Sequence, residues 1–231
     1  MKTLFAALLI AGAAPTLAFA QTEPATRAPQ AGDAARLAGL IVPEAQMPAL
    51  IAIGFRKGFG DSLAANPAGK AIYDANPGMQ DFVAERVSKE LARFAVAGLP
   101  SLREQLAAIV RDELEPDEMV DTITFFESPT GVKMRARATA ALEQQGAASG
   151  EEGQKLAVQA AVSDLTEADY PAITAFGASS AARKMQLVNT RIMQASKTWG
   201  VQLGTDHAAE LKKAREAAEA EYLATAKAKA K

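Results

Sequence analysis

The segment Phe125-Phe126-Glu127-Ser128-Pro129-Thr130-Gly131-Val132-Lys133-Met134, which we call the box, decides how this chain is built. A looser copy of the box, from Phe176 to Met185, begins 51 residues later. In both segments an aromatic residue precedes a serine that can start a helix, and a basic residue and a methionine follow. The two segments therefore predict two related structural units, each with a helix that ends and another that begins at the serine.

The residues upstream of each segment extend this correspondence. Pro116 suits the first position of a helix, and Thr166 and Asp169 have the spacing of a capping box. Pro129, directly after Ser128, is a further helix-start signal. We expect units over about residues 114–145 and 165–199, each made of a short helix, a sharp bend and a longer helix. The glycine-rich stretch Gln145 to Gly153 predicts a loop between them.

The rest of the chain indicates an all-α fold, a helical bundle. Alanine is abundant, and the strict apolar–polar alternation of strands is missing. The predicted helices begin with one that Asp33 caps and that runs to Val42, and one after Pro48. An amphipathic helix from Met79 is expected to end at Leu99-Pro100, and Ser101 to start the next. Asp206 can cap a last helix whose apolar face is thin, comprising Leu211, Ala218 and Tyr222.

Pairs of glycines carry two further predictions. Gly54 and Gly58 form a GxxxG pair, which predicts close packing of their helix against a neighbour. Gly200 and Gly204 are expected to end the helix that follows Ser179. The resulting plan is a helical domain over residues 34–205 and a projecting C-terminal helix or tail over residues 206–231.

The first twenty residues have the pattern of a secretory signal peptide. Lys2 supplies a positive charge, an apolar run follows from Leu4 to Ala11, and Ala18-Phe19-Ala20 is a small-x-small cleavage site. We therefore expect cleavage after Ala20 and a periplasmic location, while secretion beyond the periplasm stays open. Residues 21–33, rich in Pro, Ala, Thr and Gln, indicate a flexible leader. No later apolar run approaches the roughly 20 residues that cross a bilayer, so we do not expect a transmembrane protein after cleavage.

Composition restricts the partners and the chemistry. The formal net charge is −2, which gives no electrostatic reason to expect nucleic-acid binding. The chain has no cysteine, so disulfides and thiolate zinc sites are excluded and stability must come from packing.

The stretch from Leu114 to Met134 resembles the core signature of the domain-of-unknown-function 2059 (DUF2059) family. The matching residues are Glu118, Met119, Phe125, Phe126, Ser128, Pro129, Gly131 and Lys133. The resemblance covers about residues 77–140 and implies an exported, all-helical bacterial protein without an established activity. The copy departs from the signature because the proline, the glycine and the second aromatic residue are lost there.

The box has two interpretations. In the structural one, Phe125 and Phe126 are core residues, Ser128 is a helix cap, and Gly131 permits a close helix contact. In the functional one, Phe125, Phe126, Ser128, Pro129, Gly131 and Lys133 form an interaction site for a partner or ligand. Aromatic residues at helical spacing are usually core, which favours the structural interpretation.

No catalytic grouping stands out. A Ser-x-x-Lys arrangement at Ser128 would need a lysine where the chain has Gly131. The only histidine, His207, has no second histidine or cysteine beside it, and its position indicates a surface residue in a first turn. Five acids crowd into seven residues, which is typical of a solvated turn and only weakly of a cation site; they are Asp112, Glu113, Glu115, Asp117 and Glu118.

The sequence therefore predicts a non-catalytic exported helical protein, without cofactor or metal, that binds a periplasmic partner protein or envelope component. One alternative is a binder of a small apolar ligand or lipid between the helices, which the Met-, Phe- and Leu-rich faces would line. An uncharacterised hydrolase is the third interpretation. The terminal Lys-Ala repeats, Lys227 to Lys231, favour a solvated end over contact with anionic lipid or polymer.

Overall fold

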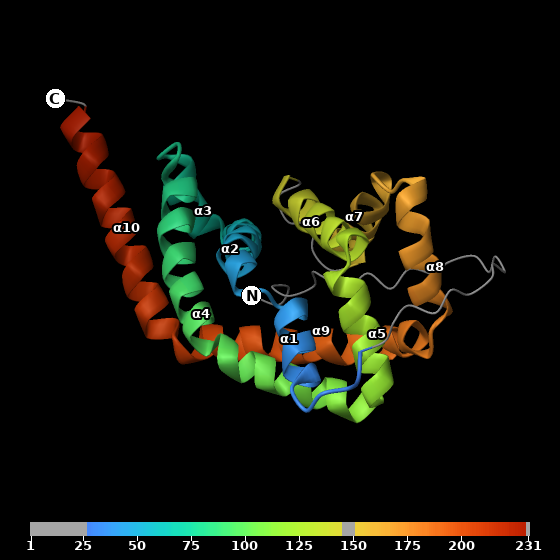
Figure 1. The fold of residues 1–231 in the computed structure, drawn as a ribbon. Helices are drawn as coiled ribbons and strands as arrows, with labels where there is room; N and C mark the ends of the chain where they lie inside the picture. Colours follow the sequence, from blue (N-terminus) through green and yellow to red (C-terminus); the bar gives the residue numbers. More distant parts are fainter. Residues whose placement is uncertain (1–26, 145–150, 230–231) are drawn as a thin grey trace.

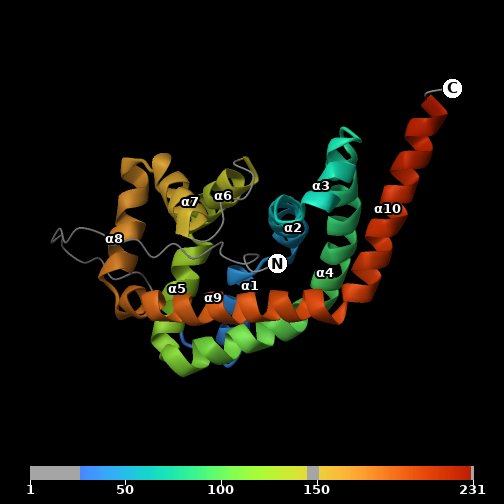
Figure 2. The ribbon, with the colours of Figure 1, turned by 180° about the vertical axis from the view of Figure 1, so that it is seen from behind.

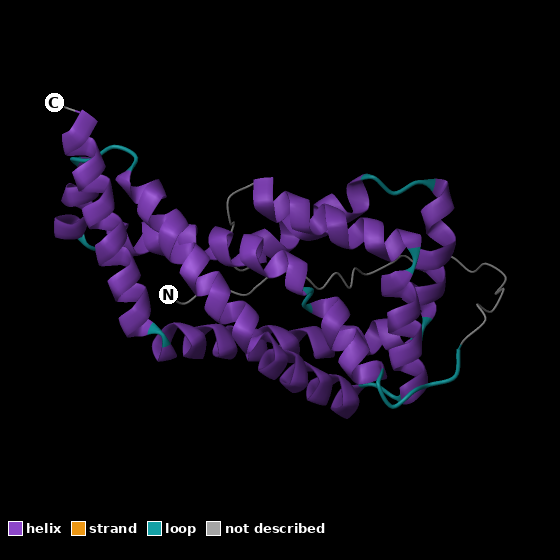
Figure 3. Cartoon of the chain, turned by 60° about the vertical axis from the view of Figure 1, so that its left-hand side comes forward, coloured by secondary structure: helices purple, strands orange, loops and turns teal. Residues whose placement is uncertain are grey.

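The computed structural model describes residues 27–144 and 151–229, and within them the chain is all-α with no strand (Figure 3). The expected signal peptide and most of the leader lie outside the described residues. The helices, in chain order, are α1 (Asp33–Ile41), η1 (Glu44–Gln46), α2 (Met47–Ala64), α3 (Pro67–Asp74), α4 (Met79–Glu113), α5 (Pro116–Glu127), α6 (Pro129–Gln144), α7 (Glu151–Ser163), η2 (Glu167–Asp169), α8 (Tyr170–Ala178), α9 (Ser180–Asp206) and α10 (Ala208–Lys229).

The 35-residue helix α4 is the central element of the molecule. The prediction that this helix ends at Leu99-Pro100 is wrong, because α4 continues through both residues. Pro100 lies inside the helix, and the ribbon of α4 bends between its two halves (Figure 1). A proline removes one intrahelical hydrogen bond and kinks a helix. Leu99 and Leu102, on either side of this bend, are completely buried. Packing on both sides of the proline therefore outweighs the lost hydrogen bond, and Ser101 starts no new helix.

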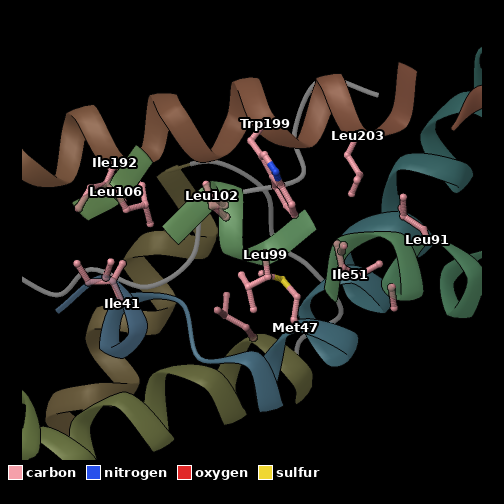
Figure 4. Close-up of a cluster of buried hydrophobic side chains, with 14 of the residues drawn as sticks. Ile41, Met47, Ile51, Leu91, Leu99, Leu102, Leu106, Ile192, Trp199 and Leu203 are labelled. Carbon is pink, nitrogen blue, oxygen red and sulfur yellow. The ribbon is translucent and has the colours of Figure 1, made fainter. Parts of the chain in front are cut away.

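The two halves of α4 have different neighbours. Helix α9 lies along the second half, α10 packs against the first half, and α1 and α2 also pack on α4 (Figures 1 and 2). At the bend, Trp199 of α9 packs on Gly98, where an added Cβ would lie 3.3 Å from the indole Cζ2. The main core is a cluster of aliphatic side chains from these helices (Figure 4). Its members include Ile41, Met47, Ile51, Leu99, Leu102, Leu106, Ile192 and Leu203.

Helix α9 continues through Gly200 and Gly204, so the prediction that these glycines end it is wrong. Trp199 and Leu203 on the buried side of α9 are held against α4. Such packing outweighs the roughly 1 kcal/mol that each glycine costs in a helix. Asp206 is the last residue of α9 rather than the cap of α10, and the break falls at His207.

The predicted apolar face of α10 packs against α4. Leu211 and Ala218 are buried, and the ring of Tyr222 lies 5.6 Å from that of Phe82. Polar contacts reinforce this packing, because Tyr222 donates to the carbonyl oxygen of Pro77 and Arg86 pairs with Glu221 at 2.7 Å. The last turns carry exposed residues such as Lys227, and residues 230–231 lie outside the described part.

The N-terminal helices differ in detail from the expectation. Asp33 is the first residue of α1 instead of its cap, and its carboxylate accepts a hydrogen bond from the Gln30 N–H at 2.7 Å. A Cβ added at Gly58 would meet no atom within 4 Å, so this glycine makes no close helix contact. The stretch Asp33–Ala64 has the length and hydropathy of a membrane span, but it supplies core residues such as Met47 and Ile51. We interpret it as a core segment.

Turn chemistry follows the sequence more closely. The Asn66 side chain accepts from the Gly69 N–H at 3.2 Å and caps α3. Gly78 has φ +88°, a conformation that glycine adopts without strain, and it precedes α4 as the Asn-Pro-Gly turn predicts. The loop expected over Gln145 to Gly153 is shorter, because α7 begins at Glu151. Residues 145–150 lie outside the described part.

Candidate functional site

The box forms a sharp junction between two helices, as the sequence predicts. Helix α5 ends at Glu127 and α6 begins at Pro129, with Ser128 in an extended conformation between them (φ −62°, ψ 155°). The Ser128 hydroxyl donates to the carbonyl oxygen of Phe125 at 2.7 Å and accepts from the Gly131 N–H at 3.0 Å. One hydroxyl thus satisfies an orphan carbonyl of the first helix and an orphan N–H of the second.

Gly131 is required by the close approach of the two helix ends. A Cβ placed there would collide with the Phe125 carbonyl oxygen and would lie 2.9 Å from the Phe126 Cα. Backbone atoms cannot give way as a flexible side chain can. The glycine of the box therefore sets how tightly α6 folds back on α5.

The two aromatic residues of the box are core residues. Phe125 and Phe126 are both buried. The half-buried Arg135 donates to the carbonyl oxygens of Leu40 and Phe126, at 3.1 and 3.0 Å, and so ties α1, α5 and α6 together. Burial lowers the pKa of Arg135. Sequence reasoning missed Arg135, although a basic residue one turn past Gly131 was a visible signal.

The last candidate functional residue of the box, Lys133, forms an ion pair within the protein. Its ammonium donates to the Asp169 carboxylate at 2.8 Å. Asp169 also accepts from the Thr130 hydroxyl at 3.0 Å and from the Thr166 N–H at 2.8 Å. These hydrogen bonds, that of Lys133 first, hold the pKa of Asp169 far below its usual range.

The copy repeats the junction. Helix α8 ends at Ala178 and α9 begins at Ser180. Ser179, with φ −71° and ψ 158°, donates to the Phe176 carbonyl oxygen at 2.7 Å and accepts from the Ala182 N–H at 3.1 Å. The hydrogen bonds at Ser128 thus recur at the residue 51 positions later.

Contacts between the two segments are reciprocal. Lys184 donates to Glu118 at 2.7 Å, just as Lys133 donates to Asp169, and each acid occupies the N3 position of its capping box. The rings of Phe125 and Phe176 stack at 4.4 Å with an interplanar angle of 5°. All these residues correspond at the same offset: Glu118 with Asp169, Phe125 with Phe176, and Lys133 with Lys184. Lys133 of the box therefore pairs with Asp169, which lies just before the copy, and Lys184 of the copy pairs with Glu118, which lies just before the box.

The acidic run at the start of α5 has basic partners. Burial disfavours ionisation of Glu118, but hydrogen bonds from Lys184 and the Glu115 N–H outweigh it and lower its pKa. Arg191 pairs with Glu113 and lies 3.6 Å from Asp112. Within residues 27–144 and 151–229 no cluster of three or more acids or histidines could hold a metal ion. The run therefore connects α4 and α5 to α9.

Two titratable side chains outside the box have environments that the sequence did not predict. Burial, followed by the charges of Asp117 and Glu118, raises the pKa of Asp121 on α5. His207 is half-buried at the α9–α10 junction instead of lying on the surface of a first turn, and it stacks on Phe94 at 3.7 Å. Neither environment is visible in the sequence, since both depend on how the helices pack.

A family model matches residues 100–160 of the chain, and this family is described as an uncharacterized protein conserved in bacteria, DUF2059. This segment of the chain is therefore similar to the DUF2059 family. The segment contains the second part of α4, all of α5 and α6, and the box. It ends before the copy. No curated protein and no solved structure matches the chain. The DUF2059 resemblance expected from the box is thus confirmed, and it brings no activity with it.

Proposed function

We propose that this protein is an exported, non-catalytic helical protein that acts by binding a periplasmic partner protein or envelope component. One observation carries the proposal. The polar side chains of the box that could react already form hydrogen bonds within the protein. The Ser128 hydroxyl donates its single proton to the Phe125 carbonyl, and Lys133 is paired with Asp169. A nucleophilic serine needs a neighbouring base to take its proton, and the partners of Ser128 are two backbone groups.

Contacts of the same kind support a second part of the proposal, which is that α5–α6 and α8–α9 are two copies of one structural unit. The serine caps, the stacked phenylalanines and the exchanged lysines all correspond at an offset of 51 residues. Two such units that bind each other leave the remaining faces of their helices for other partners. The box then builds the scaffold, and a partner binds elsewhere.

The test is affinity enrichment with the mature protein, residues 21–231, from an extract of the bacterial envelope, followed by binding measurements with each purified candidate. We expect at least one protein or envelope component that binds with defined stoichiometry. The proposal fails if nothing binds while the protein turns over substrates from an esterase and peptidase panel and Ser128→Ala abolishes that turnover without changing the fold.

Binding of a small apolar ligand or lipid is a second candidate, and helix α2 favours it. The Asp33–Ala64 stretch contains an 18-residue window of mean hydropathy 1.5, and only 28% of that window is buried. Leu50 and Ile53 are among its partly exposed residues. Native mass spectrometry of the purified protein tests this candidate. A bound apolar molecule supports it, and an empty protein that gains no thermal stability from a lipid panel contradicts it.

A further inference from the structure

Helix α9 has an outer face that is exposed along its length. The inner side of the helix, with Ile192 and Trp199, is buried in the core. On the opposite side Leu187 is 67% exposed, more than any other large apolar side chain of the described residues, and Val201 is 49% exposed. Figure 2 shows this helix running across the front of the molecule. The outer face is therefore open to a partner that lies along α9.

The exposed residues of this face form a stripe. A helix turns by about 100° per residue, so positions three or four apart stay on one side of it. The stripe occupies such positions, and all its members are exposed: Arg183, Leu187, Thr190, Gln194, Thr198, Val201 and Thr205. Only Arg183, at one end, is charged. The stripe runs for about 33 Å along the helix, at 1.5 Å per residue.

The threonines of the stripe can be buried at little cost. The Thr190 hydroxyl donates to the Gln186 carbonyl oxygen at 3.2 Å, and the Thr205 hydroxyl donates to the Val201 carbonyl oxygen at 3.0 Å. A buried donor is costly when it loses its hydrogen bond to water and gains no other. These hydroxyl groups keep their hydrogen bonds when water is removed, so a second helix can cover them.

The stripe has the same order of residue types in both directions from Gln194. One threonine stands four residues before Gln194 and another four residues after it, at Thr190 and Thr198. One large apolar residue stands seven residues before and another seven residues after, at Leu187 and Val201. A two-fold axis at Gln194 therefore sets Leu187 against Val201 of a second, antiparallel copy. An interface of this symmetry requires such reciprocity, because each contact occurs twice.

Charge favours the same antiparallel pairing. Arg183 stands 11 residues before Gln194, and Asp206 stands 12 residues after it. Each Arg183 therefore lies at the C-terminal end of the other copy's α9, where Asp206 and the helix dipole are both negative. Both side chains are exposed, and among the described residues their hydrogen bonds are to uncharged groups, a carbonyl oxygen for Arg183 and an amide for Asp206. A parallel pairing would bring the two arginines together.

We propose that the outer face of α9 binds the same face of a second copy of this chain, so that the protein is a two-fold symmetric dimer with antiparallel α9 helices. The Gln194 amide, which donates to the Thr198 hydroxyl over a long 3.5 Å, meets its own copy on the axis. Each amide offers a donor and an acceptor to the other, and one polar position in a helix pair fixes its register. Lys197 lies at the edge of the stripe, where its long side chain keeps the ammonium group in water.

This dimer goes beyond the proposed function, because a second copy is present in the purified protein whereas an envelope partner is not. A single helix pair is a small interface, so we expect association in the micromolar range and measure it up to about 200 µM by sedimentation equilibrium. Gln194→Lys places two like charges on the axis and should weaken association at least about tenfold. Gln159→Lys, at an exposed glutamine of α7, is the matched control and should leave association unchanged.

Cysteine cross-linking tests the orientation, because the chain has no cysteine of its own. A disulfide needs Cα atoms within roughly 7 Å. The axis brings two copies of position 194 together, so we expect Gln194→Cys to form a covalent dimer on oxidation. Leu187→Cys alone should remain monomeric, because its two copies lie about 21 Å apart along the helices. Leu187→Cys combined with Val201→Cys should cross-link again, and Gln159→Cys is the control for random collision.

The dimer is overturned if the mature protein stays monomeric, or if Gln194→Lys associates as tightly as the unsubstituted protein. It is equally overturned if Gln194→Cys cross-links no faster than Gln159→Cys. Cross-linking of Leu187→Cys alone as fast as that of Gln194→Cys contradicts the antiparallel arrangement. The proposed function fails separately: a monomeric protein that still enriches an envelope partner refutes the dimer only, and a dimer without any such partner refutes the function only.

Discussion

The junctions at Ser128 and Ser179 use the same hydrogen bonds and differ in how closely their helices approach. At the first, the serine N–H bonds to the carbonyl oxygens of both Thr124 and Phe125. At the second, the Ser179 N–H bonds to the Phe176 carbonyl oxygen, and Ala182 stands where the first has Gly131. The comparison separates two roles: the serine sets where the helix breaks, and the glycine sets how tight the break is.

The largest expected difference between the junctions comes from their stacked aromatic rings. Phe125 is 8% exposed, whereas Phe176 is only partly buried. Phe125→Ala is expected to lower the free energy of unfolding by about 3–5 kcal/mol. Phe176→Ala, which loses the same stack but less burial, should cost about half of that. Urea unfolding followed by circular dichroism measures both, and equal losses would contradict the asymmetry.

The next difference concerns the glycine. Gly131→Ala forces a Cβ against the Phe125 carbonyl, and we expect a loss of about 2–3 kcal/mol in the free energy of unfolding. The reverse change at the copy, Ala182→Gly, removes no contact that the break needs. It should cost at most about 1 kcal/mol through helix propensity. Urea unfolding of both variants measures the difference, and a tolerated Gly131→Ala would show that the tight approach is not required.

The serine caps are expected to be equivalent. Ser128→Ala and Ser179→Ala each remove one hydroxyl that donates and accepts one hydrogen bond. Each should lower the free energy of unfolding by about 1 kcal/mol. Thermal unfolding of the two variants and of their combination checks this. A loss at Ser128 several times that at Ser179 would mean that the first serine does more than cap its helix.

The smallest expected effect is the dependence of stability on pH that the Lys133–Asp169 and Lys184–Glu118 pairs create. Asp169 and Glu118 have lower pKa values in the folded protein than in the unfolded chain. Their contribution to stability is therefore complete above the unfolded pKa, about 4, and is lost as the pH falls through the folded pKa. Lys133→Met should flatten this acid dependence, and Lys184→Met should do so less, because the pKa of Asp169 is the more strongly depressed.

Melting temperatures between pH 3 and pH 7 measure these slopes, and Lys70→Met serves as a control. Lys70 pairs with Asp74 on the surface, where both side chains are more than half exposed. Such pairs contribute little to stability, so this variant should follow the unsubstituted protein at every pH. If the melting temperatures of all three lysine variants depend on pH in the same way, the Lys133–Asp169 and Lys184–Glu118 pairs contribute no more than an exposed pair does.

The sequence predicted the junctions well because their chemistry is local. A serine, the proline after it and the acid at the third helical position act on backbone groups within four residues. Predictions that failed involved competition between local propensity and packing far along the chain. Pro100, Gly200 and Gly204 have the character of helix breakers, and buried leucines and Trp199 beside them hold the helices intact.

The residues of the candidate site show the same contrast between local contacts, which the sequence predicts, and long-range contacts, which it does not. The structural roles of Phe125, Ser128 and Gly131 could be predicted from the box, since each acts within it. The partners of Lys133 and Glu118 could not, because they lie 36 and 66 residues away along the chain. The offset of 51 residues was visible in the sequence, but an offset alone does not say whether two copies touch. Reciprocal contact follows only once the helices are placed in space.

The bend of α4 has a practical consequence for all of these measurements. Trp199 is the only tryptophan of the chain, and it lies buried against Gly98 where α9 crosses the bend. Its fluorescence therefore reports on one place in the fold, free of overlap from any other indole. A red shift of its emission marks the moment when water reaches the kink, which circular dichroism, an average over all the helices, does not resolve.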